Sequence, residues 1–210
     1  MRAIIIGSGS VENNNIYKIL KPTDIIICCD GGSKHLFEEG IIPHYILGDL
    51  DSSIPQIIQF FETKNVIFKK FDCKKDATDM ELSIDFAISL GVKEIVILGA
   101  TGTRLDHTLA NINLLLKAEE ANVKATIIDK NNQIFILSDN IVLNGEKGDL
   151  VSLIPLTTCV EGVTTKGLEY PLRDATMTIG KSLGISNVML ENICSVCIKK
   201  GYLLVIKSKD

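Results

Sequence analysis

Residues 94–107, Glu-Ile-Val-Ile-Leu-Gly-Ala-Thr-Gly-Thr-Arg-Leu-Asp-His, join a short apolar run to a glycine-bearing turn and the start of an amphipathic segment. The run 94–98 is continuously apolar after its first residue, which is typical of a strand buried on both faces of a parallel sheet. The segment 104–121 has leucines and an isoleucine at helical spacing, and we expect this stripe to pack in the core. The stretch therefore predicts strand, turn and helix, the repeating unit of an α/β fold.

The first 130 residues repeat this unit. Four more apolar runs and four more helical segments alternate along them: 3–6, 24–29, 45–47 and 66–71 as strands, and 12–20, 33–39, 55–63 and 79–90 as helices. Thr78 and Glu81 match a capping box at the start of the last helix, and Gly91 closes it. Such alternation requires right-handed crossovers, so we predict a mainly parallel, Rossmann-like sheet covered on both faces.

The pattern changes after about residue 125. Eight short strand candidates follow, separated by turns rich in Asn, Gly and Pro: 126–129, 133–137, 141–143, 150–155, 158–164, 175–179, 192–198 and 203–206. They predict an all-β sandwich, with a small barrel as the alternative. We place the domain boundary at 130, which gives an α/β domain over 1–130 and a β-sandwich domain over 131–210. A β domain this small has a modest core, which favours support from a dimer partner.

Composition excludes several classes of function. The chain is 46% hydrophobic and 23% charged, which is typical of a globular protein. Its formal net charge is -4 without a block of Lys or Arg, so we expect no nucleic-acid partner. No window approaches the roughly 18 apolar residues that cross a bilayer, and the apolar run at the N-terminus is too short for a signal peptide. We therefore expect no membrane partner and a cytoplasmic location.

Six cysteines lie at 28, 29, 73, 159, 194 and 197. Cys194 and Cys197 have the spacing of a metal or redox motif, but they fall within a predicted strand, where residues three apart point to opposite faces. We expect buried free thiols in a reducing compartment.

Acidic residues follow several of the predicted strands. Asp49 and Asp51 come after 45–47, and Asp76 and Asp79 lie at the start of a helix. The carboxyl ends of parallel strands open on one crevice, where gathered carboxylates repel one another unless a cation or hydrogen bonds compensate. Mg²⁺ takes oxygen ligands and is usually shared with substrate phosphates. The pattern therefore indicates phosphoryl-type chemistry with magnesium.

Each of these motifs also has a structural interpretation. Asp49 and Asp51 suit a solvated turn, and Asp79 complements a helix dipole. Asp30 with the two glycines after it fits a tight turn as well as it fits a ligand site. In the stretch 99–107, the glycines permit close backbone approach and the amides at the helix start attract anions, which favours a ligand site. A lone histidine such as His107, in contrast, usually has a structural role.

Taken together, these residues resemble the thiamine pyrophosphokinase family. Six motifs occur in the family's order: Asp-Gly-Gly at 30–32, Gly-Asp-Leu-Asp-Ser at 48–52, Lys-Asp-Ala-Thr-Asp at 75–79, Gly-Ala-Thr-Gly-Thr-Arg-Leu-Asp-His at 99–107, Gly-Leu-Glu-Tyr-Pro-Leu at 167–172 and Gly-Ile-Ser-Asn at 184–187. The resemblance implies a nucleotide- and metal-binding α/β domain, a β-sandwich that binds thiamine and forms the homodimer, and thiamine held between one subunit's α/β domain and the partner's sandwich. It implies transfer of the diphosphate of ATP to thiamine, giving thiamine diphosphate and AMP.

The resemblance also assigns residues to roles. The catalytic aspartates would be Asp49, Asp51, Asp76 and Asp79, of which Asp49, Asp51 and Asp79 would bind Mg²⁺. The nucleotide would contact Gly102, Arg104, Asp106, His107 and Asn111, and thiamine would contact Asp30, Ser186 and Asn187.

One departure concerns the aromatic partner of thiamine. Some members stack thiamine on a tryptophan of the β domain, and this chain has no Trp, so another side chain must take that place. Three other functions fit the same motifs: a hydroxymethylpterin diphosphokinase, a metal-dependent phosphoesterase and a thiamine-sensing protein without turnover.

Overall fold

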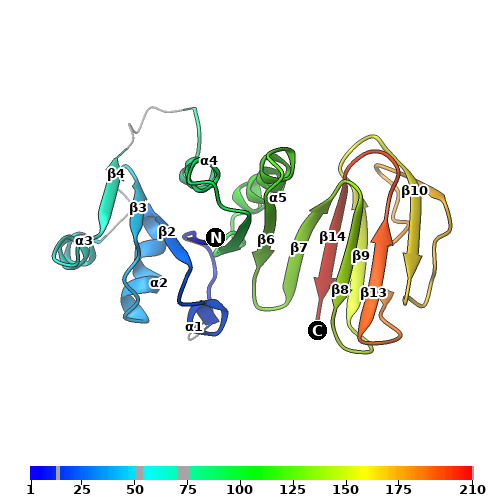
Figure 1. The fold of residues 1–210 in the computed structure, drawn as a ribbon, viewed down its shortest axis with the longest axis horizontal. Helices are drawn as coiled ribbons and strands as arrows, with labels where there is room; N and C mark the ends of the chain where they lie inside the picture. Colours follow the sequence, from blue (N-terminus) through cyan, green and yellow to red (C-terminus); the bar gives the residue numbers. More distant parts are fainter. Residues whose placement is uncertain (13–14, 51–53, 71–75, 210) are drawn as a thin grey trace. The chain divides into compact units, whose positions relative to one another are not determined.

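The computed structural model describes residues 1–12, 15–50, 54–70 and 76–209 (Figure 1). These residues form two compact units, Met1–Lys130 (unit 1) and Asn131–Asp210 (unit 2). Unit 1 mixes helices with strands and unit 2 is rich in strands, which confirms the predicted two-part organisation. Within the described ranges, no helix combines the length and the apolar character required to cross a bilayer.

Unit 1 is built around six parallel strands in the order β6-β5-β1-β2-β3-β4. The strands are β1 (Arg2–Ile6), β2 (Ile25–Cys29), β3 (Tyr45–Gly48), β4 (Ile67–Lys70), β5 (Glu94–Leu98) and β6 (Lys124–Ile128). Because β1 pairs with both β2 and β5, the strand order reverses between β1 and β5. In open α/β sheets this reversal opens a crevice at the carboxyl ends of the strands.

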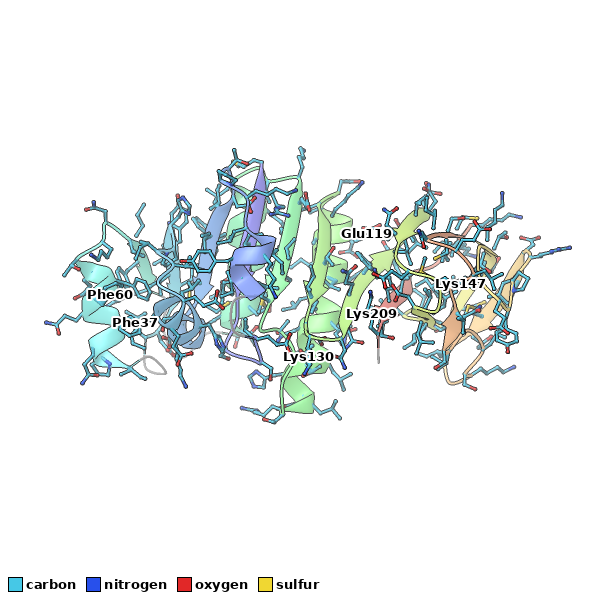
Figure 2. The ribbon with its side chains drawn as sticks, turned by 90° about the horizontal axis from the view of Figure 1, so that it is seen from below. Phe37, Phe60, Glu119, Lys130, Lys147 and Lys209 are labelled. Atoms are coloured by element: carbon cyan, nitrogen blue, oxygen red, sulfur yellow. The ribbon has the colours of Figure 1, made fainter. Side chains whose placement is uncertain are left out.

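Helices cover both faces of this sheet. They are α1 (Asn15–Ile19), α2 (Ser33–Glu38), α3 (Pro55–Glu62), α4 (Asp79–Ser89) and α5 (Leu105–Glu120), with a short 3-10 helix η1 (Asp30–Gly32) before α2. One core cluster joins α1, α2 and α3 to alternate residues of β1, β2, β3 and β5. On this side the Phe37 and Phe60 rings meet edge to face, with centroids 5.1 Å apart (Figure 2). Helices α4 and α5 contact β1, β2, β3 and β6.

The start of α4 follows its sequence signals. The Glu81 amide donates to Thr78 Oγ1 at 3.2 Å, as the capping box predicts, and Met80, Ile84 and Ala87 are buried. The burial of α5 differs from its prediction. In α5, Leu115 is buried, but Leu105 is 68% exposed and Leu109 is 52% exposed.

The reason lies in which side of α5 meets the protein. Its buried residues, Asn111, Leu115 and Ala118, lie close together on the helix surface. Leu105 and Leu109 lie more than a quarter-turn away from that side. Apolar spacing correctly indicates that these leucines share a face, but the sequence does not say that the face is covered.

Unit 2 contains two four-stranded groups. One has the order β12-β9-β14-β7 and the other β11-β10-β13-β8, and every pairing that the structure describes within them is antiparallel. The strands are β7 (Asn132–Leu137), β8 (Asn140–Asn144), β9 (Leu150–Pro155), β10 (Cys159–Lys166), β11 (Ala175–Thr178), β12 (Asn187–Val188), β13 (Ile193–Cys197) and β14 (Leu203–Ser208). One core cluster draws residues from both groups, including Leu153, Val160, Val196 and Val205.

The cysteines follow their prediction in part. Cys28, Cys29, Cys159, Cys194 and Cys197 are all free thiols, and Cys73 lies outside the described residues. Cys194 is buried and Cys197 is exposed, because they point to opposite faces of β13. The expectation of burial is wrong for Cys197, and Cys159 is only half-buried.

Candidate active site

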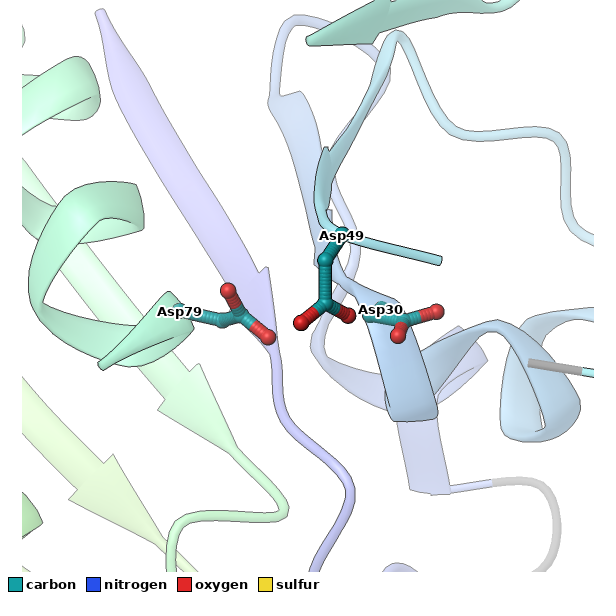
Figure 3. Close-up of side chains that lie close together, drawn as sticks. All are labelled: Asp30, Asp49 and Asp79. Carbon is teal, nitrogen blue, oxygen red and sulfur yellow. The ribbon is translucent and has the colours of Figure 1, made fainter. Parts of the chain in front are cut away.

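Three aspartates meet at the carboxyl ends of β2 and β3 and the start of α4 (Figure 3). Asp30 is the first residue of η1, Asp49 directly follows β3, and Asp79 is the first residue of α4. Carboxylate oxygens of the three residues lie within 4.8 Å of one another. Asp30 is only 1% exposed. The parallel sheet therefore brings together acids that are 19 and 30 positions apart in the sequence.

Gly48 makes this approach possible. A Cβ atom built on Gly48 would lie 2.6 Å from Asp30 Cβ and 3.3 Å from Asp79 Oδ2. Any side chain there would push β3 away from the other two aspartates. Two residues later, Leu50 has φ 67°, a conformation that costs a non-glycine residue about 1 kcal/mol or more. The close approach of the three aspartates thus depends on Gly48.

The electrostatics of this group suit a divalent cation. At separations near 5 Å and an effective dielectric constant of about 20, each pair of charged carboxylates repels by roughly 3 kcal/mol. Like charges at this range persist when a cation or hydrogen bonds compensate them. Three carboxylates offer the hard oxygen ligands that Mg²⁺ prefers.

The membership of this group differs from the predicted metal set. Asp49 and Asp79 were both predicted as ligands, whereas Asp30 was assigned to thiamine. Asp51, the third predicted ligand, lies outside the described residues. Asp76 is exposed and is not a member of the group.

A hollow of about 190 Å³ adjoins the carboxylates at the reversal of strand order. It is lined by Asp79 and by residues from the strand ends and helix starts around it: Gly7, Ser8, Cys29, Gly31, Thr78, Met80, Gly99, His107 and Asn111. The loops after β1 and β5 interlock here. Gly9 N donates to Gly99 O, and Ser10 N donates to Thr101 O, both at 2.8 Å. A Cβ on Gly9 would lie 2.6 Å from Gly99 O, so only glycine allows this interlock.

The residues predicted for the nucleotide surround the start of α5. His107 and Asn111 line the hollow, and Asn111 Nδ2 also donates to Ala100 O at 2.8 Å. Gly102 is exposed, and its amide donates to Thr108 Oγ1 at 3.2 Å.

Arg104 and Asp106 form an exposed bidentate ion pair. Arg104 Nη2 lies 2.7 Å from Asp106 Oδ2, and Nε lies 3.2 Å from Oδ1. The hydrogen bond from Arg104, with the backbone amide of His107, lowers the pKa of Asp106 to about 2. Asp106 is therefore a carboxylate throughout the physiological pH range, and it accepts rather than donates hydrogen bonds.

The two residues of unit 2 that were predicted to contact thiamine differ in burial. Asn187 is 4% exposed, and its side chain bonds to both backbone polar groups of Tyr170: Oδ1 accepts from the amide at 3.0 Å and Nδ2 donates to the carbonyl at 2.7 Å. The Tyr170 side chain is 64% exposed. Ser186 is exposed in a left-handed conformation (φ 54°), and its amide donates to Ser152 Oγ at 3.0 Å. Asn187 thus holds the backbone that presents Tyr170.

Two further parts of the hollow are not among the residues predicted from the sequence. Gly7 and Ser8 line it, and their loop has a simple signal, small residues directly after an apolar run. Cys29 also lines it, and its thiol lies 3.3 Å from Ser83 Oγ. Burial raises the pKa of Cys29 to about 12, so this residue is a neutral thiol and not a nucleophile.

Comparison with known proteins matches both units. The family model "Thiamin pyrophosphokinase, catalytic domain" matches residues 16–127, and "Thiamin pyrophosphokinase, vitamin B1 binding domain" matches residues 132–203. The thiamine pyrophosphokinase of Bacillus subtilis is 34% identical over 183 residues, 86% of each chain.

Solved structures give the same result over the whole chain. The crystal structure of thiamine pyrophosphokinase from Bacillus subtilis superposes with a TM-score of 0.91 at 30% identity and covers 100% of both chains. That of thiamin pyrophosphokinase from Geobacillus thermodenitrificans superposes with a TM-score of 0.88 at 28% identity, covering 100% of this chain and 98% of the other.

Proposed function

This chain belongs to the thiamine pyrophosphokinase family, and on that premise we propose that Asp30, Asp49 and Asp79 hold the magnesium with which it works. The enzyme transfers the diphosphate of ATP to the hydroxyl of thiamine, giving thiamine diphosphate and AMP. The observation that carries the proposal is the meeting of three carboxylates at the end of the sheet where the hollow opens.

The reaction makes one bond and breaks one. The thiamine hydroxyl oxygen bonds to the β-phosphorus of ATP, the bond from that phosphorus to the oxygen of the α-phosphate breaks, and the hydroxyl proton is released. Such a transfer depends mainly on in-line positioning and on neutralising polyphosphate charge. Bound Mg²⁺ supplies the charge neutralisation. The carboxylates of the group hold their positions through the strand ends and the start of α4.

Two predicted catalytic residues remain proposals with different support. Asp51 follows Asp49 by two positions and belongs to the same Gly-Asp-Leu-Asp-Ser stretch at 48–52, which resembles the family's motif. Asp76 lies three positions before Asp79 and is exposed. We infer a direct role in metal binding for Asp51 and a peripheral role for Asp76.

We place the nucleotide polyphosphate at the hollow and the start of α5. This helix has 16 residues, and its N-cap residue Arg104 makes no side-chain cap, so first-turn amides and the positive end of the dipole favour an anion. Arg104 adds an exposed guanidinium three positions before His107, which lines the hollow. Gly102, Asp106 and Asn111 complete the nucleotide side in this proposal.

For thiamine we propose Tyr170 as the aromatic surface that replaces tryptophan. Its ring is exposed, while its backbone is fixed on both sides by Asn187. A phenol ring held in this way offers its face to a thiazolium cation. Asn187 then acts through Tyr170, whereas the exposed Ser186 can contact the substrate directly.

We further propose a cytoplasmic homodimer with a Rossmann-like α/β unit and a sandwich in unit 2. The exposed Leu105 and Leu109 lie one turn apart on α5 and support the dimer, because adjoining exposed apolar side chains mark interfaces more often than single ones do. Sedimentation of the purified protein tests it, with a dimer mass expected.

The test of the function is a product assay with purified protein, Mg-ATP and thiamine. Equal amounts of AMP and thiamine diphosphate, formed only when thiamine is present, are expected. ADP in place of AMP would overturn the reaction. Competition by a hydroxymethylpterin with turnover of the pterin would move the substrate to the pterin class, and binding of thiamine without any nucleotide product would indicate a sensor.

A further inference from the structure

His35 makes a contact that the reaction does not explain. It is the third residue of α2, and its Nε2 atom is 2.9 Å from the carbonyl oxygen of Gly9. Because a carbonyl oxygen only accepts, Nε2 must carry the proton and donate. The imidazole therefore holds one point of the loop after β1 from the side of α2.

That loop is held on its other side by the chain that follows β5. The amides of Gly9 and Ser10 donate to Gly99 O and Thr101 O, and Gly7 and Ser8 of the same loop line the hollow. The Gly9 carbonyl that accepts from His35 belongs to the same residue whose amide reaches Gly99. Gly9 is thus held at its amide by the chain after β5 and at its carbonyl by His35.

The short helix η1, directly before α2, contacts the same loop and contributes to the carboxylate group. A Cβ on Gly31 would lie 2.8 Å from Ser8 Cβ, so η1 packs directly against the loop. Asp30, at the start of η1, reaches into the carboxylate group, and His35 lies five positions further on. One short segment, 30–35, therefore touches both the carboxylates and the loop that shapes the hollow.

We propose that His35 is a positioning residue for the polyphosphate of ATP, acting through the loop 7–10. Without its hydrogen bond, the Gly9 carbonyl is released and Gly7 and Ser8 no longer keep the wall of the hollow in place. This inference rests on the proposed function, because it takes the hollow as the polyphosphate site. His35 touches no reacting atom, so binding of ATP should suffer more than turnover.

The test compares three substitutions of His35. In a glutamine side chain the amide nitrogen reaches the position of Nε2, whereas asparagine is too short to reach it. We expect His35→Ala and His35→Asn to raise KM for Mg-ATP about 5- to 20-fold, the range of one hydrogen bond to a partly buried backbone group, with kcat changed less than 3-fold. His35→Gln should restore KM to within about 2-fold of the parent protein.

His44 provides a matched control. Its Nδ1 atom accepts from the backbone amide of Ile26 at 3.0 Å, so it also bonds to the backbone, but at the opposite end of β2. His44→Ala should lower the midpoint of thermal unfolding and leave KM for Mg-ATP unchanged.

The outcomes separate this inference from the proposed function. Equal KM values in His35→Ala, His35→Gln and the parent would overturn the inference, while continued formation of AMP by the parent would leave the function intact. A fall in kcat equal to or larger than the rise in KM would also overturn it, because His35 would then act on the chemistry and not on binding. If His35→Ala fails to fold, the contrast between His35→Gln and His35→Asn decides the question.

Discussion

The two ends of strand β2 gather charge in opposite ways. Before its amino end, Asp24 is nearly buried and meets Arg2, with Nη2–Oδ2 at 2.6 Å and Nε–Oδ1 at 3.0 Å. After its carboxyl end, Asp30 is just as buried and meets two further carboxylates. The first arrangement pairs unlike charges and supports the fold. The second gathers like charges, which opposes folding unless a cation or hydrogen bonds compensate, and this difference locates function at the carboxyl end.

The largest effect is expected at the carboxylate group. Asp49→Asn removes one charge with almost no change in shape, so turnover should fall by about 10³-fold. The free energy of unfolding without metal should stay the same or rise, because one repulsion is removed. Product assays and denaturant titrations measure the two quantities. Normal turnover in this variant would remove Asp49 from the metal site.

At Arg2 we expect the opposite result, a loss of stability with little loss of turnover. Arg2→Leu leaves Asp24 buried without its partner and should lower the free energy of unfolding by about 3 kcal/mol, while turnover per folded molecule stays within about 2-fold because the pair lies at the far end of the strands. Lys34→Ala serves as the control, since it breaks an exposed ion pair with Glu38 and should cost less than about 0.5 kcal/mol. Equal losses in the two variants would contradict the comparison.

Gly48→Ala tests how closely the strand ends must approach. The new Cβ would meet Asp30 Cβ at 2.6 Å, so we expect turnover to fall about 10²-fold, as for other small displacements of catalytic groups. Gly40→Ala is the matched control: Gly40 also has positive φ (67°), but nothing lies within 4 Å of its Cβ position. This control should lose about 1 kcal/mol of stability and no activity. A Gly48→Ala variant with full activity would show that the aspartates need not be so close.

The smallest effect concerns acid stability at the amino end. Burial alone would raise the pKa of Asp24, but hydrogen bonds from Arg2 and from the Lys21 amide outweigh it, and the pKa is lowered. A carboxyl with a lowered folded-state pKa adds stability above its unfolded value near 4, and this stability is lost as the pH falls through the folded value. The difference in unfolding free energy between the parent and Arg2→Leu should therefore be largest near neutral pH and shrink as the pH falls, because protonation relieves the unpaired Asp24 of the variant and removes the ion pair of the parent. A difference that grows toward low pH would contradict this sign.

The alternation of strands and helices was predictable because each element carries its own signal. Apolar runs mark β2 and β5 to within a residue, and the Thr78 cap marks the start of α4. The two-residue strand β12 was not predictable, because Asn187 and Val188 are too few to show any period. Nor could spacing reveal that Leu105 and Leu109 of α5 lie on an uncovered face.

The location of the candidate site was predictable from the sequence, but the set of residues that compose it was not. Residues that follow parallel strands share one edge of the sheet, and this places Asp30, Asp49 and Asp79 there. Which of them touch depends on strand order, because β2 and β3 are neighbours and α4 packs against both. It depends also on Gly48, whose missing side chain makes room for Asp30. Neither condition appears in the local pattern around Asp30, which fits a tight turn and a ligand site equally well.

A titration with metal decides whether Asp30 is part of the metal site. Mn²⁺, a paramagnetic substitute for Mg²⁺ with the same preference for oxygen ligands, would be titrated by electron paramagnetic resonance with ATP present and thiamine absent. The parent would be compared with Asp30→Asn and with Asp76→Asn, which changes an exposed acid nearby. We predict that Asp30→Asn weakens Mn²⁺ binding at least 10-fold while Asp76→Asn leaves it unchanged. Unchanged binding in Asp30→Asn would contradict the account.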